Sequence, residues 1–256
     1  KRRASPRGSK TMVALGVVTA SLAWRDAEGE TWTNAGLGRL IEAIGKRTRR
    51  LTLAISTTPR RTDQHDHRLS IPSAAIRLLP PMAGIQAGLF EGARCGRIIH
   101  DVEASADAVV VQLPFSAPTA ILRARRPRVY HVCADLPAVV TASRYYRGFR
   151  RVAAVGMAQA IDQLQRHVMW DGARVVTNGS ALRRRYGNPP GRSIVSSALH
   201  AAEIGSVARR ESVDSRFTVL FVGYLRPEKG VNVLLDAFRS FLDVEPEAKL
   251  VVVHDP

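Results

Sequence analysis

Cysteine and long apolar runs are both scarce in this sequence, and each scarcity excludes a class of protein. The chain has 2 cysteines in 256 residues, Cys95 and Cys133, and no close group of metal-binding residues accompanies them. This usage fits a reduced, cytoplasmic protein rather than a disulfide-stabilised secreted one. The longest uncharged run, 108–122, is interrupted by Pro114 and Pro118 and does not reach the roughly 20 apolar residues that cross a bilayer.

Acidic residues are also few, and basic residues greatly outnumber them. The sequence has 22 Asp and Glu against 38 Lys and Arg, of which 33 are arginine, and its formal net charge is +16. Such a surface attracts phosphates, acidic lipids or nucleic acid, although a coding bias toward arginine explains the same composition. The hydrophobic content of 45% indicates a globular protein, and the length allows one large domain or two small ones.

The clearest pattern lies near the end of the sequence, at 217–253. Residues 217–222 are apolar or β-branched and uncharged, which predicts a strand buried on both faces of a parallel sheet. Apolar residues then recur at helical spacing from Val231 to Leu242, and residues 249–253 predict a second strand. In such a crossover, the loop and the helix N-terminus lie at the carboxyl edge of the sheet, where free N–H groups favour an anion.

Two cations lie in the loop of this unit, Arg226 and Lys229, after Gly223 ends the first strand. An arginine can hold a phosphate through two hydrogen bonds, and a lysine acts as a point charge. The loop therefore predicts a diphosphate site, with ordinary solvated turn residues as the alternative.

The segment 223–230, Gly-Tyr-Leu-Arg-Pro-Glu-Lys-Gly, is followed by Leu-Leu-Asp-Ala-Phe at 234–238. Together they resemble the opening of the donor domain in GT-B glycosyltransferases, in particular the retaining family four (group 1 type). The resemblance implies that Arg226, Lys229 and Gly223 bind the donor diphosphate. It implies transfer of a sugar from a nucleotide sugar to an acceptor hydroxyl with retention, without a cofactor or a metal. It also implies an α/β fold of two Rossmann-like domains facing a cleft, the second represented only by its first strand–helix–strand unit.

The start of the sequence has the same organisation. The basic residues 1–10 and the apolar stretch 11–24 imitate a secretory signal. A first strand is the favoured interpretation, because a helix at 35–45 and a strand at 51–56 follow at once. The family has a glycine-rich loop here that faces acceptor and donor phosphates, and its positional match includes Asn34 and Gly36. The family often has two adjacent glycines, whereas Gly36 and Gly38 are separated, and helix-start packing is the alternative role.

Further strands are predicted at 76–79, 107–114, 128–132, 173–178 and 193–197, and helices at 118–126, 152–169 and 181–186. The family often places a histidine after the strand that corresponds to 108–111, but this chain has Gln112, which cannot act as a base. His131 lies in the next strand and is expected to be a core or pocket residue. Asp135 is a candidate ligand of an acceptor hydroxyl, with a solvated turn as the alternative. No catalytic residue is identified.

Two other clusters contain residue types that bind metal ions or anionic surfaces. His65, Asp66 and His67 are adjacent, and three adjacent residues rarely converge on one ion, so no metal site is predicted. The segment 144–151 combines aromatic residues with arginines, which are Arg144, Arg147, Arg150 and Arg151. It could contact an anionic membrane or a phosphorylated acceptor, and nucleic-acid binding would use the same residue types. A plain exposed helix end is the alternative.

We predict a basic lead at 1–10, an acceptor domain at 11–200, a linker at 201–216 and the start of the donor domain at 217–256. The family's paired glutamates lie further along the donor domain, so the chain is expected to be an inactive fragment by itself. The expected partners are a nucleotide sugar and a glycan, lipid-linked or small-molecule acceptor, without nucleic acid. The expected location is the cytoplasm, with peripheral contact to the inner membrane face. A GT-B nucleotide-sugar epimerase and a basic module that binds membrane or nucleic acid remain open alternatives.

Overall fold

The computed structural model describes residues 12–72, 75–82, 90–143, 145–170, 174–186, 192–194, 216–223, 225 and 229–253. The chain divides into two compact units, Lys1–Asp135 with Met157–Ala198 and Leu136–Gly156 with Leu199–Pro256. Among the described helices, none has both the length and the apolar character of a membrane span.

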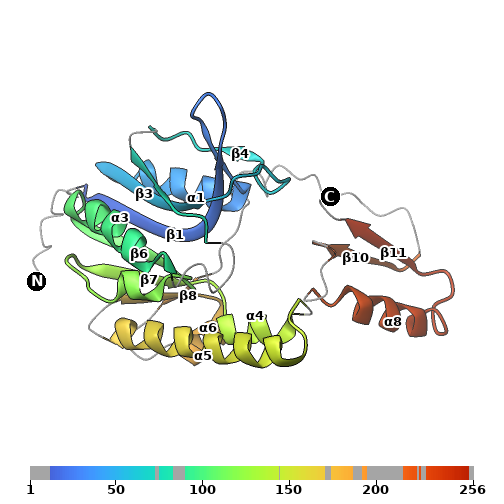
Figure 1. The fold of residues 1–256 in the computed structure, drawn as a ribbon. Coiled ribbons are helices and arrows are strands. Elements are labelled where there is room, and N and C mark those ends of the chain that lie inside the picture. Colours follow the sequence, from blue (N-terminus) through green and yellow to red (C-terminus); the bar gives the residue numbers. More distant parts are fainter. Residues whose placement is uncertain are drawn as a thin grey trace, which may run out of the picture. The chain divides into compact units, whose positions relative to one another are not determined.

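A parallel sheet organises the first unit (Figure 1), and its parallel strands follow the order β5-β3-β1-β6-β7-β8-β9. The strands span Ala14–Arg25 (β1), Arg50–Thr57 (β3), Ile76–Leu79 (β5), Ala108–Leu113 (β6), Arg128–Val132 (β7), Arg174–Asn178 (β8) and Arg192–Ile194 (β9). The chain adds strands outward from β1 to β5 and then returns to place β6 on the other side of β1. This order is that of a doubly wound α/β fold, in which ligands bind at the carboxyl ends of the strands that flank the reversal.

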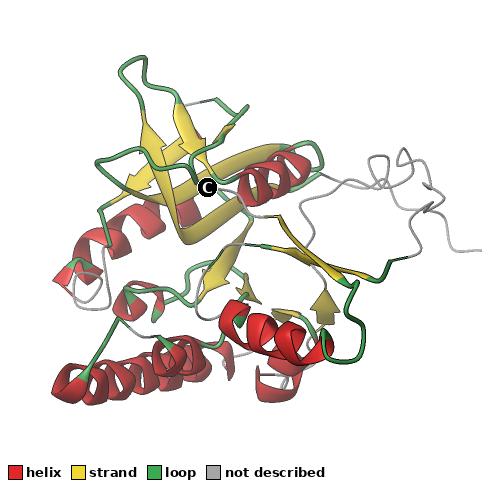
Figure 2. Cartoon of the chain, turned by 90° about the vertical axis from the view of Figure 1, so that its right-hand side faces the viewer, coloured by secondary structure: helices red, strands yellow, loops and turns green. Residues whose placement is uncertain are grey.

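Both faces of the central strands of this sheet are buried. The helices are α1 (Ala35–Gly45), α3 (Gly92–Ala104), α5 (Gly148–Trp170) and α6 (Ser180–Tyr186). Val17 and Leu53 pack with residues of α1 in one core cluster, whereas Val18 and Ala54 pack with residues of α3 in the other. Because side chains alternate along a strand, α1 and α3 cover opposite faces of the sheet. Figure 2 shows helices flanking the strands of this sheet.

The predicted helix at 118–126 is wrong in most of its length. Only a short 3-10 turn, η2 (Pro118–Ile121), forms there. The side chain of Arg128 donates hydrogen bonds to the carbonyl oxygens of Ile121 and Arg123. In an α-helix, these carbonyls would accept hydrogen bonds from backbone N–H groups of the next turn. The backbone is therefore tied to β7 instead of continuing as a helix. Helix α5, in contrast, begins at Gly148, which is earlier than the predicted start at 152.

A small antiparallel extension forms from two segments for which the sequence analysis predicts no strand. Strand β1 shifts register between Thr19 and Leu22 and then runs on to pair with β2 (Thr31–Thr33), which pairs with β4 (His67–Arg68). The loops at 25–34 and 57–67 therefore contribute strands to the nine-stranded sheet. Their turn residues hid the short pairing segments, because such short strands depend on their partners rather than on their own pattern.

The second unit contains the strand–helix–strand segment that the sequence predicted. The burial predicted for its first strand is wrong, because Leu220 and Val222 are 61% and 69% exposed. Strand β10 (Thr218–Val222) pairs in parallel with β11 (Lys249–Val253), and α8 (Val231–Phe241) connects them. Helix α8 lies along this two-stranded sheet in Figure 1. Helix α4 (Leu136–Ala142), which the sequence analysis did not predict, also belongs to this unit. The α/β fold class is confirmed by the doubly wound sheet and by this parallel β–α–β segment.

Candidate functional site

A chain of polar side chains crosses the carboxyl ends of β1, β6 and β7, next to the reversal of strand order. Gln112 lies at its centre. Its Oε1 accepts hydrogen bonds from Thr19 and, at 3.3 Å, from the hydroxyl of Ser21. Its Nε2 donates to the sulfur of Cys133 at 3.1 Å. Gln112, which the sequence analysis excluded as a base, therefore links β1, β6 and the end of β7.

His131 and Cys133 lie two residues apart on β7 and the turn that follows it, so they share a face. The sulfur of Cys133 lies 3.6 Å from both ring nitrogens of His131. Burial lowers the pKa of His131 below its ordinary value, which keeps the imidazole neutral near pH 7. Burial raises the pKa of the Cys133 thiol, and the hydrogen bond from Gln112 opposes this only in part. The cluster is therefore uncharged, with donors and acceptors suited to hydroxyl groups.

Asp135 follows β7 but is not a solvated turn residue. Its carboxylate forms an ion pair with Arg185 of α6 at 2.7 Å. Arg185 also binds Asp162 at 3.1 Å, and Asp162 accepts a hydrogen bond of 2.6 Å from the hydroxyl of Tyr186. Burial, followed by this hydrogen bond, raises the pKa of Tyr186 to about 12. Arg185 thus fixes Asp135 against a half-buried network between α5 and α6.

The N-terminus of α1 is closed by the protein's own side chains. Asn34 is the N-cap, and its Oδ1 accepts a hydrogen bond of 2.9 Å from the backbone N–H of Leu37. Asp66 accepts a second hydrogen bond, at 2.8 Å, from the backbone N–H of Ala35. Gly36 lies in the first turn between these contacts. The structure gives Asn34 a capping role and places a carboxylate where an anion would otherwise bind.

His67 is fixed against α1 and does not form a metal site with its neighbours. Its Nε2 lies 3.0 Å from the carboxylate of Glu42, and Gly38 leaves room for its ring. His65 instead accepts a hydrogen bond from the backbone N–H of Thr62. Among the residues that the structure describes, no group of three or more potential ligands could hold a metal ion.

Helix α8 begins differently from α1. Its N-cap is Gly230, which has a left-handed backbone with φ of 71° and offers no side chain to the first N–H groups of the helix. Lys229, directly before it, is exposed. The N–H of Gly223 donates to the carbonyl of Val253 at 3.0 Å and so extends the strand pairing. Arg226 lies outside the described residues.

The basic aromatic segment is exposed where it is described. Tyr145 and Phe149 are 87% and 84% exposed, and Arg147 and Arg150 are exposed beside them. Arg151 donates to the carbonyl of Thr141 at 2.8 Å and so ties the start of α5 to α4. Arg144 lies outside the described residues. The anionic-surface role of the other arginines stays a prediction.

Sequence reasoning missed Thr19, Ser21, Cys133 and Asp66 as parts of these sites. The sequence contains a signal for Ser21 and another for Cys133. Ser21 follows the predicted first strand's apolar core, and Cys133 shares the alternation of His131 along β7. Nothing in the local pattern pairs Asp66 with a helix that begins far before it in the sequence.

Comparison with known proteins gives only a coarse likeness. No family model matches the chain, and no curated protein matches it. One similar solved structure is a protein from Listeria monocytogenes assigned as a UDP-N-acetylglucosamine 2-epimerase, with 16% identity and a TM-score of 0.44. Another is MnaA from S. aureus in a co-structure with UDP, with 11% identity and a TM-score of 0.40. The matches cover 94% of this chain but 62% of each neighbour, so neither the activity nor the substrate of this protein follows from them.

Proposed function

We propose that this chain is part of an enzyme that acts on a nucleotide sugar and that the β10–α8–β11 unit binds the diphosphate. The observation that carries this proposal is the start of α8. Gly230 leaves the first N–H groups without an N-cap side chain, and the exposed cation Lys229 precedes it. A helix N-terminus with adjacent positive charge stabilises phosphate oxygens. Arg226, which the resemblance assigns to the same ligand, would add a second cation.

The carboxyl edge of the large sheet would bind an uncharged, hydroxyl-rich group. Gln112 and Ser21 can exchange hydrogen bonds with sugar hydroxyls, and the neutral His131 can donate or accept one. The nearby carboxylate, Asp135, is held by Arg185 and orients that arginine. An uncharged polar site next to a strand-order reversal suits a sugar or an acceptor alcohol.

Two reactions on a nucleotide sugar fit these residues. The resemblance of residues 223–238 favours transfer of the sugar to an acceptor hydroxyl, with Arg226 and Lys229 stabilising the leaving diphosphate. Epimerisation requires a group that removes a proton from a sugar carbon, and the neutral imidazole of His131 is of that type. Epimerisation therefore requires His131 as a base, whereas transfer of the sugar does not.

The first experiment titrates the full-length protein with UDP, GDP and ADP and their sugar derivatives. Arg226→Ala and Lys229→Ala should each weaken binding of the preferred nucleotide about tenfold, since each removes a charged hydrogen bond. Arg239→Ala and Lys249→Ala remove the same charges elsewhere in the unit and should leave the affinity unchanged. Salt-sensitive binding of any polyanion, without nucleotide preference, would instead favour a basic binding module.

The second experiment distinguishes the reactions. The preferred nucleotide sugar is incubated in D₂O without an acceptor and followed by proton NMR. An epimerase produces the epimer and exchanges the carbon-bound hydrogen, and His131→Gln should abolish both. A transferase produces neither, and forms a new glycoside only when an acceptor alcohol is added. Nucleotide binding with neither product in either condition would contradict both reactions.

A further inference from the structure

The amino edge of the large sheet, opposite the Gln112 cluster, contains a cavity of about 450 Å³. Ala108, Arg128 and Arg174 are the first residues of β6, β7 and β8, and all three line it. Small-molecule sites have volumes of roughly 300–1,000 Å³, so this cavity can hold a compact metabolite. It lies wholly within the first unit.

The wall of this cavity is cationic. Its basic residues are Arg126, Arg128, Arg174 and His167, and none of its lining residues is acidic. Helix α5 ends nearby at Trp170, and its C-terminus contributes an opposing partial charge of about half a unit. The guanidinium groups of Arg126 and Arg174 together outweigh that partial charge, so the wall favours an anion as its ligand.

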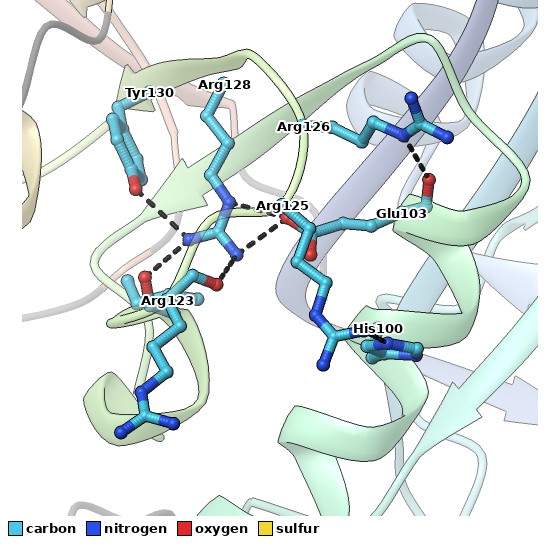
Figure 3. A network of polar contacts seen from close by, with 8 residues as sticks. His100, Glu103, Arg123, Arg125, Arg126, Arg128 and Tyr130 are labelled. Carbon is cyan, nitrogen blue, oxygen red and sulfur yellow. Dashed lines mark hydrogen bonds and ion pairs between the residues drawn. The ribbon is translucent and has the colours of Figure 1, made fainter.

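Arg128 belongs to the support of the cavity and not to its binding surface. Figure 3 shows its guanidinium surrounded by hydrogen-bond partners. It contacts the carboxylate of Glu103 at 2.8 Å and 2.9 Å, and it also donates to two backbone carbonyls and to Tyr130. Both charged side chains are almost fully buried. The pair neutralises Glu103, so this carboxylate does not oppose an anion in the cavity.

Arg126 is held by a single hydrogen bond among the described residues. Its Nε donates to the backbone carbonyl of Glu103 at 3.3 Å, as Figure 3 shows. Its two terminal nitrogens have no hydrogen-bond partner among the described residues. Arg174 likewise makes no hydrogen bond or ion pair through its side chain within the described part of the chain, and pairing with Val129 fixes its backbone. Two guanidinium forks on one cavity match the two charges of a phosphate monoester.

We propose that this cavity binds a small organic phosphate, with Arg126 and Arg174 on the phosphate group. Leu122, Val129 and Val168 form an apolar part of the wall, against which the carbon skeleton would lie. This site is independent of the proposed diphosphate site at α8, because it uses no residue of that unit. It would be a second ligand site of the protein, at the edge of the sheet opposite the Gln112 cluster.

The test uses the full chain with saturating UDP, so that the α8 site is filled, and measures ribose 5-phosphate binding by calorimetry. The double variant Arg126→Gln/Arg174→Gln should weaken this binding at least tenfold and leave UDP binding unchanged. Arg94→Gln/Arg97→Gln removes the same charge from the exposed surface of α3 and should have no effect. An equal loss in this control, or displacement of ribose 5-phosphate by UDP, would overturn the proposal.

A second measurement needs no variant. Phenylglyoxal modification of the wild-type protein is mapped by mass spectrometry with and without ribose 5-phosphate. Arg126 and Arg174 should be protected, whereas Arg94 should not. Inorganic phosphate should bind more weakly than ribose 5-phosphate because it cannot use the apolar wall. Absence of protection, or equal affinity for the two ligands, would contradict an organic-phosphate site.

Discussion

Two strand–helix–strand units in this protein share one plan and differ at the start of the helix. In β1–α1–β3, Asn34 and Asp66 accept hydrogen bonds from the first N–H groups of α1. In β10–α8–β11, the N-cap is Gly230, which has no side chain to offer, and Lys229 precedes it. The difference shows that a parallel crossover creates a possible anion site only where the protein does not cap the helix itself.

The capped first turns of α1 pack closely against His67 at Gly38. Gly38→Ala should therefore have the largest effect. A Cβ at Gly38 would overlap the side-chain ring of His67, so this ring and its contact with Glu42 would have to shift. We expect a loss of about 1–3 kcal/mol in the free energy of unfolding, despite the better helix propensity of alanine. Urea denaturation of the full chain measures this loss.

Gly156→Ala in α5 is the matched control, because nothing lies within 4 Å of the added Cβ. This variant should be more stable by about 0.5–1 kcal/mol. If both substitutions stabilise the protein, His67 does not constrain α1 as the structure indicates.

Removing either cap should also weaken the start of α1. Asn34→Ala and Asp66→Ala should each reduce the free energy of unfolding by about 1 kcal/mol, since each leaves an N–H group of α1 without its acceptor. Thermal unfolding measures the change. Asp63→Ala alters an exposed acid in the same loop and should have little effect. Equal effects of Asp63→Ala and Asp66→Ala would mean that loop charge, and not capping, supports α1.

The start of α8 can be tested through its backbone conformation. Gly230 has a φ of 71°, so Gly230→Ala should cost about 1–2 kcal/mol locally, as alanine avoids the left-handed region. Gly230→Asn should cost less, because asparagine tolerates that region. Hydrogen exchange of the first turn of α8 should rise more for alanine than for asparagine. The reverse order would indicate that this helix does not begin with a left-handed residue.

The smallest effect concerns the charge state of His131 at the carboxyl edge of the large sheet. Burial lowers the pKa of His131 in the folded protein, so the unfolded chain takes up the proton first as the pH falls. Its contribution to stability is present above the ordinary value of 6.5 and is lost as the pH falls toward the folded pKa. His131→Gln should therefore show a smaller decrease in stability between about pH 7 and pH 5 than the wild type.

His167→Gln, which changes an exposed histidine, should retain the wild-type dependence. A dependence that is unchanged in His131→Gln would mean that His131 titrates normally. In that case the carboxyl edge of the large sheet would become charged at mildly acidic pH, and its contrast with the cationic loop before α8 would be weaker.

The success of sequence reasoning followed the regularity of the apolar pattern in each segment. The predicted strands at 76–79 and 128–132 coincide with β5 and β7, and the helix at 35–45 coincides with α1. These segments have periodic apolar residues or a defined cap. The helix at 118–126 failed because Arg128, which follows it, competes for its carbonyl groups. The extension formed by β2 and β4 was missed because a strand of two or three residues exists only through its partners.

The candidate site was predictable in position more than in composition. The order of strands and helices was enough to expect polar residues at the carboxyl edge, and His131 and Asp135 do lie there. Their partners were not predictable. Gln112 connects three strands through side-chain hydrogen bonds, and Asp135 is bound by Arg185, which is contributed by a helix after the next strand.

The sequence by itself determined the α/β class, the parallel strands and the placement of Lys229 directly before a helix, because these depend on local periodicity and on residue type. Only the tertiary structure decided which helix N-terminus is capped by side chains. It also decided which carboxylates and arginines of the described residues form ion pairs with each other. Asp66 reaches α1, and Arg128 reaches Glu103, across many residues of intervening chain. Such contacts depend on how distant segments pack, and that packing is set by the whole core rather than by any local pattern.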